Sequence, residues 1–250
     1  MKNVNSDVAY IHIRKRIIGG TYRPGEPLMT NELSAEIGVS RTPVRDALRQ
    51  LEADGLVVIR PHLGASVKSM SFKEYQEMCG LRLALESYAA GLAAQNRTND
   101  ELRDMALAVE AMRSLTARLA AEPMETQVLI EELRREDVRF HIGIITASKS
   151  ELLKKEVLRL HIVSRVVAGP APGGGSPITD KAEKDARRTV VQASHEAIYQ
   201  AIEKADEAAA KATMEHHIKD ISESSLRAMA RADTGLLARQ LSDEELSYST

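Results

Sequence analysis

Tryptophan is absent from this sequence and phenylalanine occurs only twice, so a buried core has to be built mainly from aliphatic side chains, which favours packed helices. The single cysteine, Cys79, cannot form an intramolecular disulfide and fits a reducing cytoplasm. No apolar run approaches the roughly 18 residues that a membrane-spanning helix needs, and the N-terminus lacks the basic-then-apolar pattern of a signal peptide. We therefore expect a cytoplasmic protein without a membrane partner.

Net charge is also small, at −2, but it is unevenly distributed along the chain. Residues 1–70 hold ten Lys and Arg against seven Asp and Glu, a net charge of +3, whereas the remaining 180 residues hold 24 against 29, a net charge of −5. A chain of 250 residues allows one large domain or two smaller ones. The basic surface is thus expected on the N-terminal part. Because +3 is modest for a DNA-binding domain, we expect two copies of the chain on one DNA site.

The stretch Gly38–Arg49 has the pattern of the turn and second helix of a helix-turn-helix. Ser40 suits the N-cap position, and Pro43 falls in the first turn, where its missing N–H costs little. An apolar stripe follows at positions i, i+3, i+4 and i+7, formed by Val44, Ala47, Leu48 and Leu51. A row of arginines on another face can reach guanine edges or phosphates in a major groove. The row consists of Arg41, Arg45 and Arg49. Taken alone, it is also compatible with a solvated basic face on an ordinary helix.

The segments around this helix add the other parts of a winged helix. A short helix is expected ahead of the turn, over residues 31–37. Two strands are expected after it, at Leu56–Arg60 and Ala65–Lys68, with the turn Pro61–Gly64 between them. Helix, turn, helix and a two-stranded wing together make a winged helix-turn-helix.

Three motifs resemble the DNA-binding domain of GntR-family bacterial transcription regulators: Gly20–Leu28, Gly38–Leu48, and Leu51–Leu56 followed by Gly64. The resemblance extends from about residue 8 to residue 67 and implies that the protein binds double-stranded operator DNA. It assigns DNA contacts to the positions that match the family's contact residues, which are Ser40, Arg41, Thr42, Pro43, Arg45 and Gly64. Arg49 joins this set as the third member of the arginine row. Some family members carry a basic residue at the position of Asn31, where this chain has a neutral amide.

A capping box at Ser71–Glu74 marks the start of a new helix and a domain boundary. Strand patterns are absent beyond it, and helices are expected over about 71–95, 98–121, 125–147, 150–168, 180–205 and 207–231. Gly169–Pro177 is expected to be a loop, and Asp233–Gly235 to end the last long helix. We therefore expect a mainly α chain: a winged helix at 1–70, an all-α bundle of six or seven helices at 71–232, and a tail at 233–250. This organisation resembles the FadR-type branch of the family, with its FCD effector domain. The domain's opening pattern R-x-x-L-E matches Arg82–Glu86.

Three of the expected helices carry metal-ligand side chains on otherwise apolar faces. The rows are Ile130, Asp137, His141 and Ile144; Val191, His195, Ile198 and Ile202; and Ala210, Met214, His217 and Ile221. The i, i+4 spacing of Asp137 and His141 places both on one helix face, where they can bind one ion. A buried imidazole or carboxylate without a partner is costly, and a shared metal would satisfy all four groups. The alternative is three core histidines hydrogen-bonded to the backbone or to Asp137. His216 points about 100° away from His217 and is expected at the surface.

The resemblance implies the same site, because many FCD domains bind a divalent metal through one Asp and three His in this order. Asp137, His141, His195 and His217 match those positions. Mixed nitrogen and oxygen ligands favour Zn or Ni and also allow Mn, Co or Fe.

Arginine interrupts the inward row of the bundle's first helix at Arg82. It suits either a salt bridge inside the bundle, for example to Glu86, or a fork that holds the carboxylate of an effector. Arg134 lies on the row of Asp137 and His141 and is a second candidate for the effector contact.

Together these patterns predict a homodimeric repressor that senses a small organic acid at the metal site and is not an enzyme. Three alternatives stay open. The metal could be purely structural, with a different effector. The bundle could be a metal-dependent hydrolase fused to a DNA-binding domain. The chain could also be an architectural DNA-binding protein without ligand control.

Overall fold

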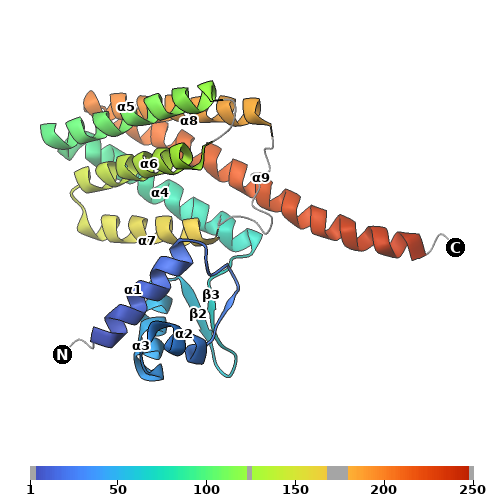
Figure 1. Ribbon diagram of the computed structural model, residues 1–250. Helices are drawn as coiled ribbons and strands as arrows, with labels where there is room; N and C mark the ends of the chain where they lie inside the picture. The colour runs from blue at the N-terminus through green and yellow to red at the C-terminus, as the bar shows by residue number, and fades with distance from the viewer. Residues whose placement is uncertain (1–3, 123–125, 168–179, 248–250) are drawn as a thin grey trace. The chain divides into compact units, whose positions relative to one another are not determined.

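The computed structural model describes residues 4–122, 126–167 and 180–247, and the chain is mainly helical, as expected (Figure 1). By its internal contacts the chain divides into two compact units. The first contains residues 1–71 and 158–175, and the second contains residues 72–157 and 176–250. Residues 158–175, which the sequence pattern assigns to the bundle, are thus grouped with the N-terminal unit. No helix among the described residues is long and apolar enough to cross a membrane.

The N-terminal unit has the expected winged helix-turn-helix. Its elements in chain order are α1 (Val4–Ile18), β1 (Pro27–Leu28), α2 (Thr30–Ile37), α3 (Arg41–Ala53), β2 (Val57–Arg60) and β3 (Gly64–Val67). The apolar stripe of α3 is buried, with Val44, Ala47, Leu48 and Leu51 at most 3% exposed. Gly38 ends α2 in the left-handed region, with φ 76°, and its N–H donates to the carbonyl of Ser34. A residue with a side chain is strained there, so Gly38 sets the turn that separates α2 from α3.

The sheet of this unit has three strands, whereas the sequence pattern predicts two. The order is β1-β3-β2, all antiparallel, and the short strand β1 pairs Pro27 with Ser66 and Leu28 with Ala65. The pairing of β2 with β3 brings Arg60 opposite Gly64 at the tip of the wing. A two-residue strand has too little alternation to be recognised in a sequence.

Ser40 occupies the N-cap position of α3, with extended backbone angles of φ −71° and ψ 168°. Its hydroxyl makes no capping hydrogen bond, contrary to the expectation, and the residue is exposed. The side chain is therefore directed to solvent rather than to the first turn of the helix.

Six helices among the described residues follow the wing, and they build the bundle except for residues 158–167, which group with the N-terminal unit. They are α4 (Phe72–Asn96), α5 (Asn99–Ala121), α6 (Gln127–Ala147), α7 (Glu151–Val167), α8 (Lys181–Glu203) and α9 (Glu207–Ser247). A capping box begins α5: the amide of Glu101 donates to Thr98, and the Glu101 carboxylate accepts from the Thr98 amide. The expected loop Gly169–Pro177 lies outside the described residues.

The expected end of the last helix at Asp233–Gly235 is wrong, because α9 continues to Ser247. One glycine inside a helix costs only about 1 kcal/mol relative to alanine. The residues that follow Gly235 are mostly good helix formers, including Leu236, Leu237 and Ala238.

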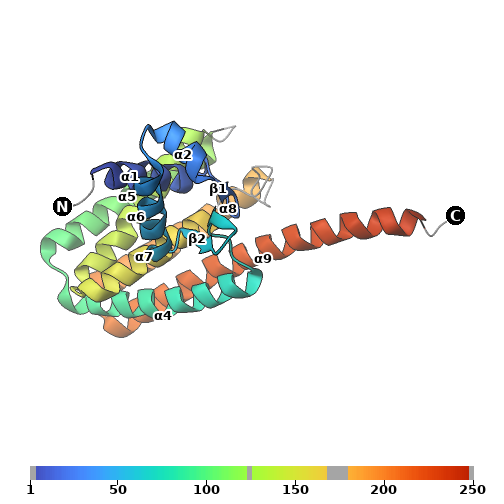
Figure 2. The same cartoon turned by 90° about the horizontal axis from the view of Figure 1, so that it is seen from below.

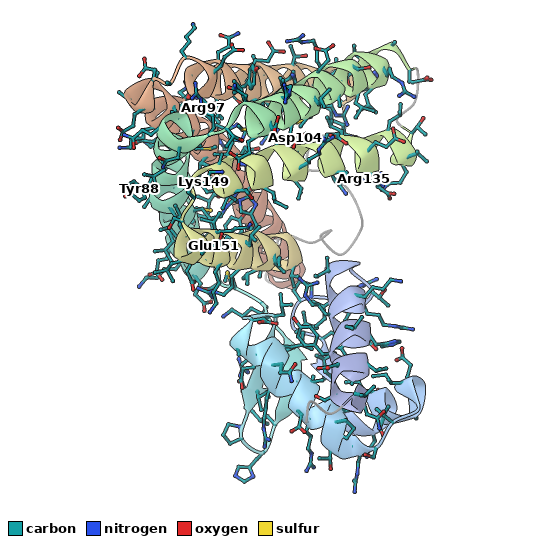
Figure 3. The ribbon with its side chains drawn as sticks, turned by 90° about the vertical axis from the view of Figure 1, so that its left-hand side faces the viewer. Tyr88, Arg97, Asp104, Arg135, Lys149 and Glu151 are labelled. Atoms are coloured by element: carbon teal, nitrogen blue, oxygen red, sulfur yellow. The ribbon has the colours of Figure 1, made fainter. Side chains whose placement is uncertain are left out.

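The bundle core is almost entirely aliphatic. Helices α4 and α9 lie side by side, as both Figure 1 and Figure 2 show. The buried residues of α4 include Ala89, Ala90 and Gly91, whose small size suits close packing. At Gly91 an added Cβ would come within 2.5 Å of the Lys211 side chain of α9. Charged side chains such as Asp104, Arg135 and Glu151 point outward from the bundle (Figure 3). Phe140 is buried at 0% exposure inside it. Buried polar side chains beside Phe140, such as His141 and His195, therefore stand out in this apolar core.

Candidate functional site

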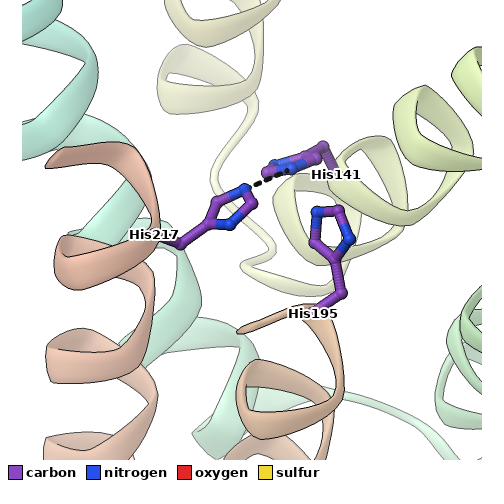
Figure 4. A group of neighbouring side chains, drawn as sticks. All are labelled: His141, His195 and His217. Carbon is purple, nitrogen blue, oxygen red and sulfur yellow. Dashed lines mark hydrogen bonds between the residues drawn. The ribbon is translucent and has the colours of Figure 1, made fainter. Parts of the chain in front are cut away.

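Three imidazoles converge inside the bundle from three different helices (Figure 4). His141 comes from α6, His195 from α8 and His217 from α9, and they are 4%, 1% and 1% exposed. Each histidine lies on the apolar face of its helix, as the helical rows predict. Packing of the three apolar faces brings the histidines together. One ring nitrogen from each histidine lies within 4.8 Å of those of the other two, which is the arrangement needed to hold one ion.

Nε2 of His217 lies 3.3 Å from Nε2 of His141. The rings of His195 and His217 have centroids 4.5 Å apart, and Phe140 packs edge-on against His195 at 5.3 Å. Phe140 thus packs against the cluster, and all three imidazoles are buried.

Asp137 lies one helical turn before His141 on α6. Its Oδ1 atom is 3.2 Å from Nε2 of His195, while 41% of its side-chain surface is exposed. Among the described residues, the buried Nε2 of His195 makes no hydrogen bond, and the Asp137 carboxylate lies beside it at ion-pair distance. The four predicted ligand residues are therefore brought together, with Asp137 at the outer edge.

The cluster shifts the pKa values of its members in different directions. Burial and the neighbouring imidazoles lower the pKa of His217 to about 2. Burial also lowers the pKa of His195. Burial acts in the same direction on His141, but the carboxylates of Glu86 and Asp137 outweigh it and raise that pKa. Burial opposes ionisation of Asp137, yet the nearby histidines lower its pKa overall. The lowered pKa values favour neutral His195 and His217 beside an ionised Asp137, which are the states that bind a metal. The raised pKa of His141 favours its protonated form, so metal binding there would release a proton.

The geometry fits a divalent metal on two counts. Two nitrogens bound to one tetrahedral zinc, each about 2.0–2.1 Å from the metal, are about 3.3 Å apart. This is the separation of the two Nε2 atoms of His141 and His217. The second count is the buried Nε2 of His195, which lacks a hydrogen bond among the described residues and which a metal would satisfy.

Two of the imidazoles have a polar neighbour at Nδ1, the ring nitrogen directed away from the shared centre. Nδ1 of His217 lies 2.7 Å from Oγ of Ser194, and Nδ1 of His141 lies 3.4 Å from Oε2 of Glu86. Glu86 also accepts a hydrogen bond of 2.8 Å from Nε of Arg82. No sequence pattern singles out Ser194, since a serine beside a histidine is common in helices of any function. The i, i+4 spacing of Arg82 and Glu86 is the signal that could have linked Glu86 to the site.

The two arginines expected to contact an effector lie in different environments. Arg82 is 8% exposed and forms an ion pair with Glu86. This salt bridge is one of the two roles that the sequence allows for Arg82. Arg134 is exposed on α6. An effector contact by either residue stays a prediction.

Most of the residues expected to contact DNA present exposed side chains or backbone. The exposed members are Ser40, Arg41, Thr42, Arg45, Arg49 and Gly64. Pro43 is buried in the first turn of α3, so it shapes the helix start more than it offers contact atoms. Arg49 lies 3.5 Å from Asp46, an exposed pair that leaves its fork accessible.

Comparison with known proteins agrees with this architecture. Residues 5–67 match the model of the GntR family of bacterial regulatory proteins, and residues 77–220 match that of the FCD domain. The chain belongs to the GntR family. Residues 77–220 place it among the members that carry an FCD domain.

Relatives of this GntR-family chain are transcriptional regulators rather than enzymes. It is 30% identical over 196 residues to the probable D-xylose utilization operon transcriptional repressor of Paenarthrobacter nicotinovorans, covering 78% of this chain and 76% of the relative. It is 26% identical over 228 residues to the repressor RspR of Escherichia coli K12, covering 88% of each. The match to YdhC of Bacillus subtilis, at 37% identity, spans 37% of this chain and 42% of that protein.

Solved structures share the fold. Escherichia coli McbR/YncC superposes with a TM-score of 0.67 at 19% identity, covering 91% of this chain and 99% of that one. A GntR regulator from Rhodococcus sp. RHA1 gives a TM-score of 0.63 at 21% identity, covering 90% and 99%. At these identities the likeness concerns the fold alone.

Proposed function

We propose that this chain is a cytoplasmic, homodimeric repressor whose FCD domain binds a divalent metal and, at that metal, a small organic acid that controls DNA binding. The observation that carries the proposal is the convergence of three buried imidazoles, with the Nε2 atoms of His141 and His217 3.3 Å apart. Buried imidazoles are costly unless each finds a partner, and one metal would supply a partner to all three. Two of the relatives are named as repressors, which supports repression rather than activation as the role of this chain.

His141, His195 and His217 would hold the metal, and Asp137 would complete the set from the edge of the cluster. Zn or Ni suits these ligands best, and Mn, Co or Fe is compatible with them. A bound metal supplies a Lewis-acidic centre to which a carboxylate can add as a further ligand. Asp137, with 41% of its side chain exposed, marks the side from which an acid can approach. Arg82 and Arg134 remain the proposed partners for the effector's charge.

DNA recognition is proposed for the exposed row on α3 and the tip of the wing. In a dimer, two winged helices would face the two halves of a symmetric operator. Arg41, Arg45 and Arg49 would read bases or hold phosphates, while Gly64 would let the wing backbone approach the DNA. For regulation, the acid must bind the DNA-competent and DNA-incompetent forms of the dimer with different affinities.

A thermal-shift screen of small carboxylates tests the proposal, with the protein as isolated, after chelation, and after Zn or Ni is restored. We expect one class of acid to raise the melting temperature only when metal is present, and the same acid to weaken DNA binding. A melting temperature that follows the metal but ignores every acid would make the metal structural and overturn the sensing function. Turnover of a bound acid would instead favour the hydrolase.

A further inference from the structure

Ser194 precedes the candidate ligand His195 on α8 but contacts a different one. Its Oγ atom lies 2.7 Å from Nδ1 of His217 on α9 and 2.7 Å from the carbonyl oxygen of Val191, one turn back on its own helix. One hydroxyl therefore joins the backbone of α8 to an imidazole that α9 contributes to the cluster.

The hydroxyl has one proton for these two contacts. A carbonyl oxygen can only accept, so the contact with Val191 uses the hydroxyl proton, as helical serines commonly do. The oxygen of Ser194 then accepts from His217, which places the imidazole proton on Nδ1. The lone pair of this imidazole is thereby left on Nε2, the atom that faces His141.

The same consideration applies to the facing ring. The carboxylate of Glu86, which accepts from Arg82, lies 3.4 Å from Nδ1 of His141 and favours a proton on that nitrogen. A neutral His141 with its proton on Nδ1 would turn a second Nε2 lone pair towards Nε2 of His217, 3.3 Å away, and a cation between them would join the two. A proton on Nε2 of His141 would instead be donated to His217, as the hydrogen bond drawn in Figure 4 allows. Metal-binding histidines are typically held in the binding tautomer by an outer partner on the other nitrogen.

We propose that Ser194 is a positioning residue that fixes His217 in the Nδ1–H tautomer and so directs its Nε2 lone pair at the metal. The inference builds on the proposed metal site. Helix α8 would then have two roles in that site. His195 would bind the metal, and Ser194 would orient His217 of α9. The alternative, in which the hydroxyl donates to Nδ1, would put a proton on Nε2 and block metal binding there.

The test compares Ser194→Ala with Ser194→Thr, which keeps a hydroxyl, and with Ser87→Ala as the matched control. Ser87 makes a similar helical hydrogen bond, 2.7 Å to the carbonyl of Leu83, and no histidine of the described residues is hydrogen-bonded to it. Zn²⁺ affinity is measured by competition with a chromophoric chelator. Imidazole ¹⁵N chemical shifts in the metal-free protein report the tautomer.

In the wild type we expect His217 to be the Nδ1–H tautomer. Ser194→Ala is expected to lose this preference and to weaken Zn²⁺ binding by about 10- to 100-fold. Ser194→Thr should stay near the wild type and Ser87→Ala should match it. An unchanged tautomer with unchanged affinity in Ser194→Ala overturns the inference. If the wild type binds no Zn²⁺, the proposed metal site fails, while the ¹⁵N shifts still decide the role of Ser194.

Discussion

Nε2 of His217 lies 3.3 Å from Nε2 of His141, although the two residues are 76 positions apart in the chain. No pattern local to either helix requires this meeting. It results from the burial of two separate apolar faces, each of which carries one imidazole into the same part of the core.

Replacing a ligand should remove the metal without unfolding the bundle. We expect His195→Ala to weaken Zn²⁺ binding by more than the roughly 100-fold that loss of an outer partner costs. The Zn²⁺-dependent part of the melting temperature should disappear with it, because a metal stabilises only the form that binds it. The control is His216→Ala, whose imidazole is 74% exposed and pairs with Asp220. Metal content measured by mass spectrometry at wild-type level in His195→Ala would refute the ligand set.

The DNA-contact assignment predicts a selective loss of affinity. Arg45→Ala should reduce binding to a wild-type-selected operator fragment by about 1–3 kcal/mol if the guanidinium reads a base. Binding to unrelated DNA should fall much less. Fluorescence anisotropy on both fragments measures this, with the exposed Arg135→Ala of α6 as the control. Equal losses on the two fragments would assign Arg45 to a phosphate contact instead.

The buried ion pair between Arg82 and Glu86 predicts a large stability change. Glu86 has 1% of its side chain exposed, so Arg82→Met would leave a buried carboxylate without its arginine. Such losses cost about 3–5 kcal/mol, which urea unfolding can measure. Arg135→Met at the surface should change stability by less than about 0.5 kcal/mol.

The same variant separates the two interpretations of Arg82. If it also binds the effector, Arg82→Met should weaken the response to the acid more than the affinity for Zn²⁺. A normal acid response in a destabilised protein would limit Arg82 to the ion pair with Glu86.

In the winged helix, the pH dependence of stability should reflect Glu36. Its carboxylate lies 2.8 Å from His12 and 2.7 Å from Arg16, and it accepts a 2.9 Å hydrogen bond from Tyr22. The contact with His12 first, and those with Tyr22 and Arg16, lower the pKa of Glu36. A lowered pKa stabilises the fold above the unfolded value of about 4.3, and the contribution is lost as the pH falls through the folded value.

We therefore expect Glu36→Gln to destabilise the protein at neutral pH by no more than about 1 kcal/mol, since these contacts are largely exposed. The difference from the wild type should shrink below about pH 4. Urea unfolding at several pH values measures it. A difference that grows as the pH falls would contradict the assignment.

The sequence predicted those parts of the structure that depend on local patterns. The stripe from Val44 to Leu51, the capping box at Thr98 and the histidine rows each have a helical period, and the structure places them as expected. Strand β1 was missed because two residues have no period, and its place in the sheet depends on pairing with β3. The continuation of α9 past Gly235 was not predicted, because one glycine is a weak helix end when good helix formers follow it.

Outer contacts of the site could not be predicted in the same way. The meeting of Ser194 with His217 depends on the rotation of α8 relative to α9, which no helical row specifies. The spacing of Glu86 from Arg82 predicts their ion pair. The approach of Glu86 to His141 depends instead on how α4 packs against α6. Such details follow from packing between elements.

The separation of 76 positions between His141 and His217 also bears on how the protein matures. Closing so long a loop has an entropic cost that only the packed bundle offsets, so a chain in which α9 has not docked cannot present the three nitrogens together. Metal uptake would then report that the last helix is in place. A regulator assembled in this order would acquire its sensor only after its fold is complete.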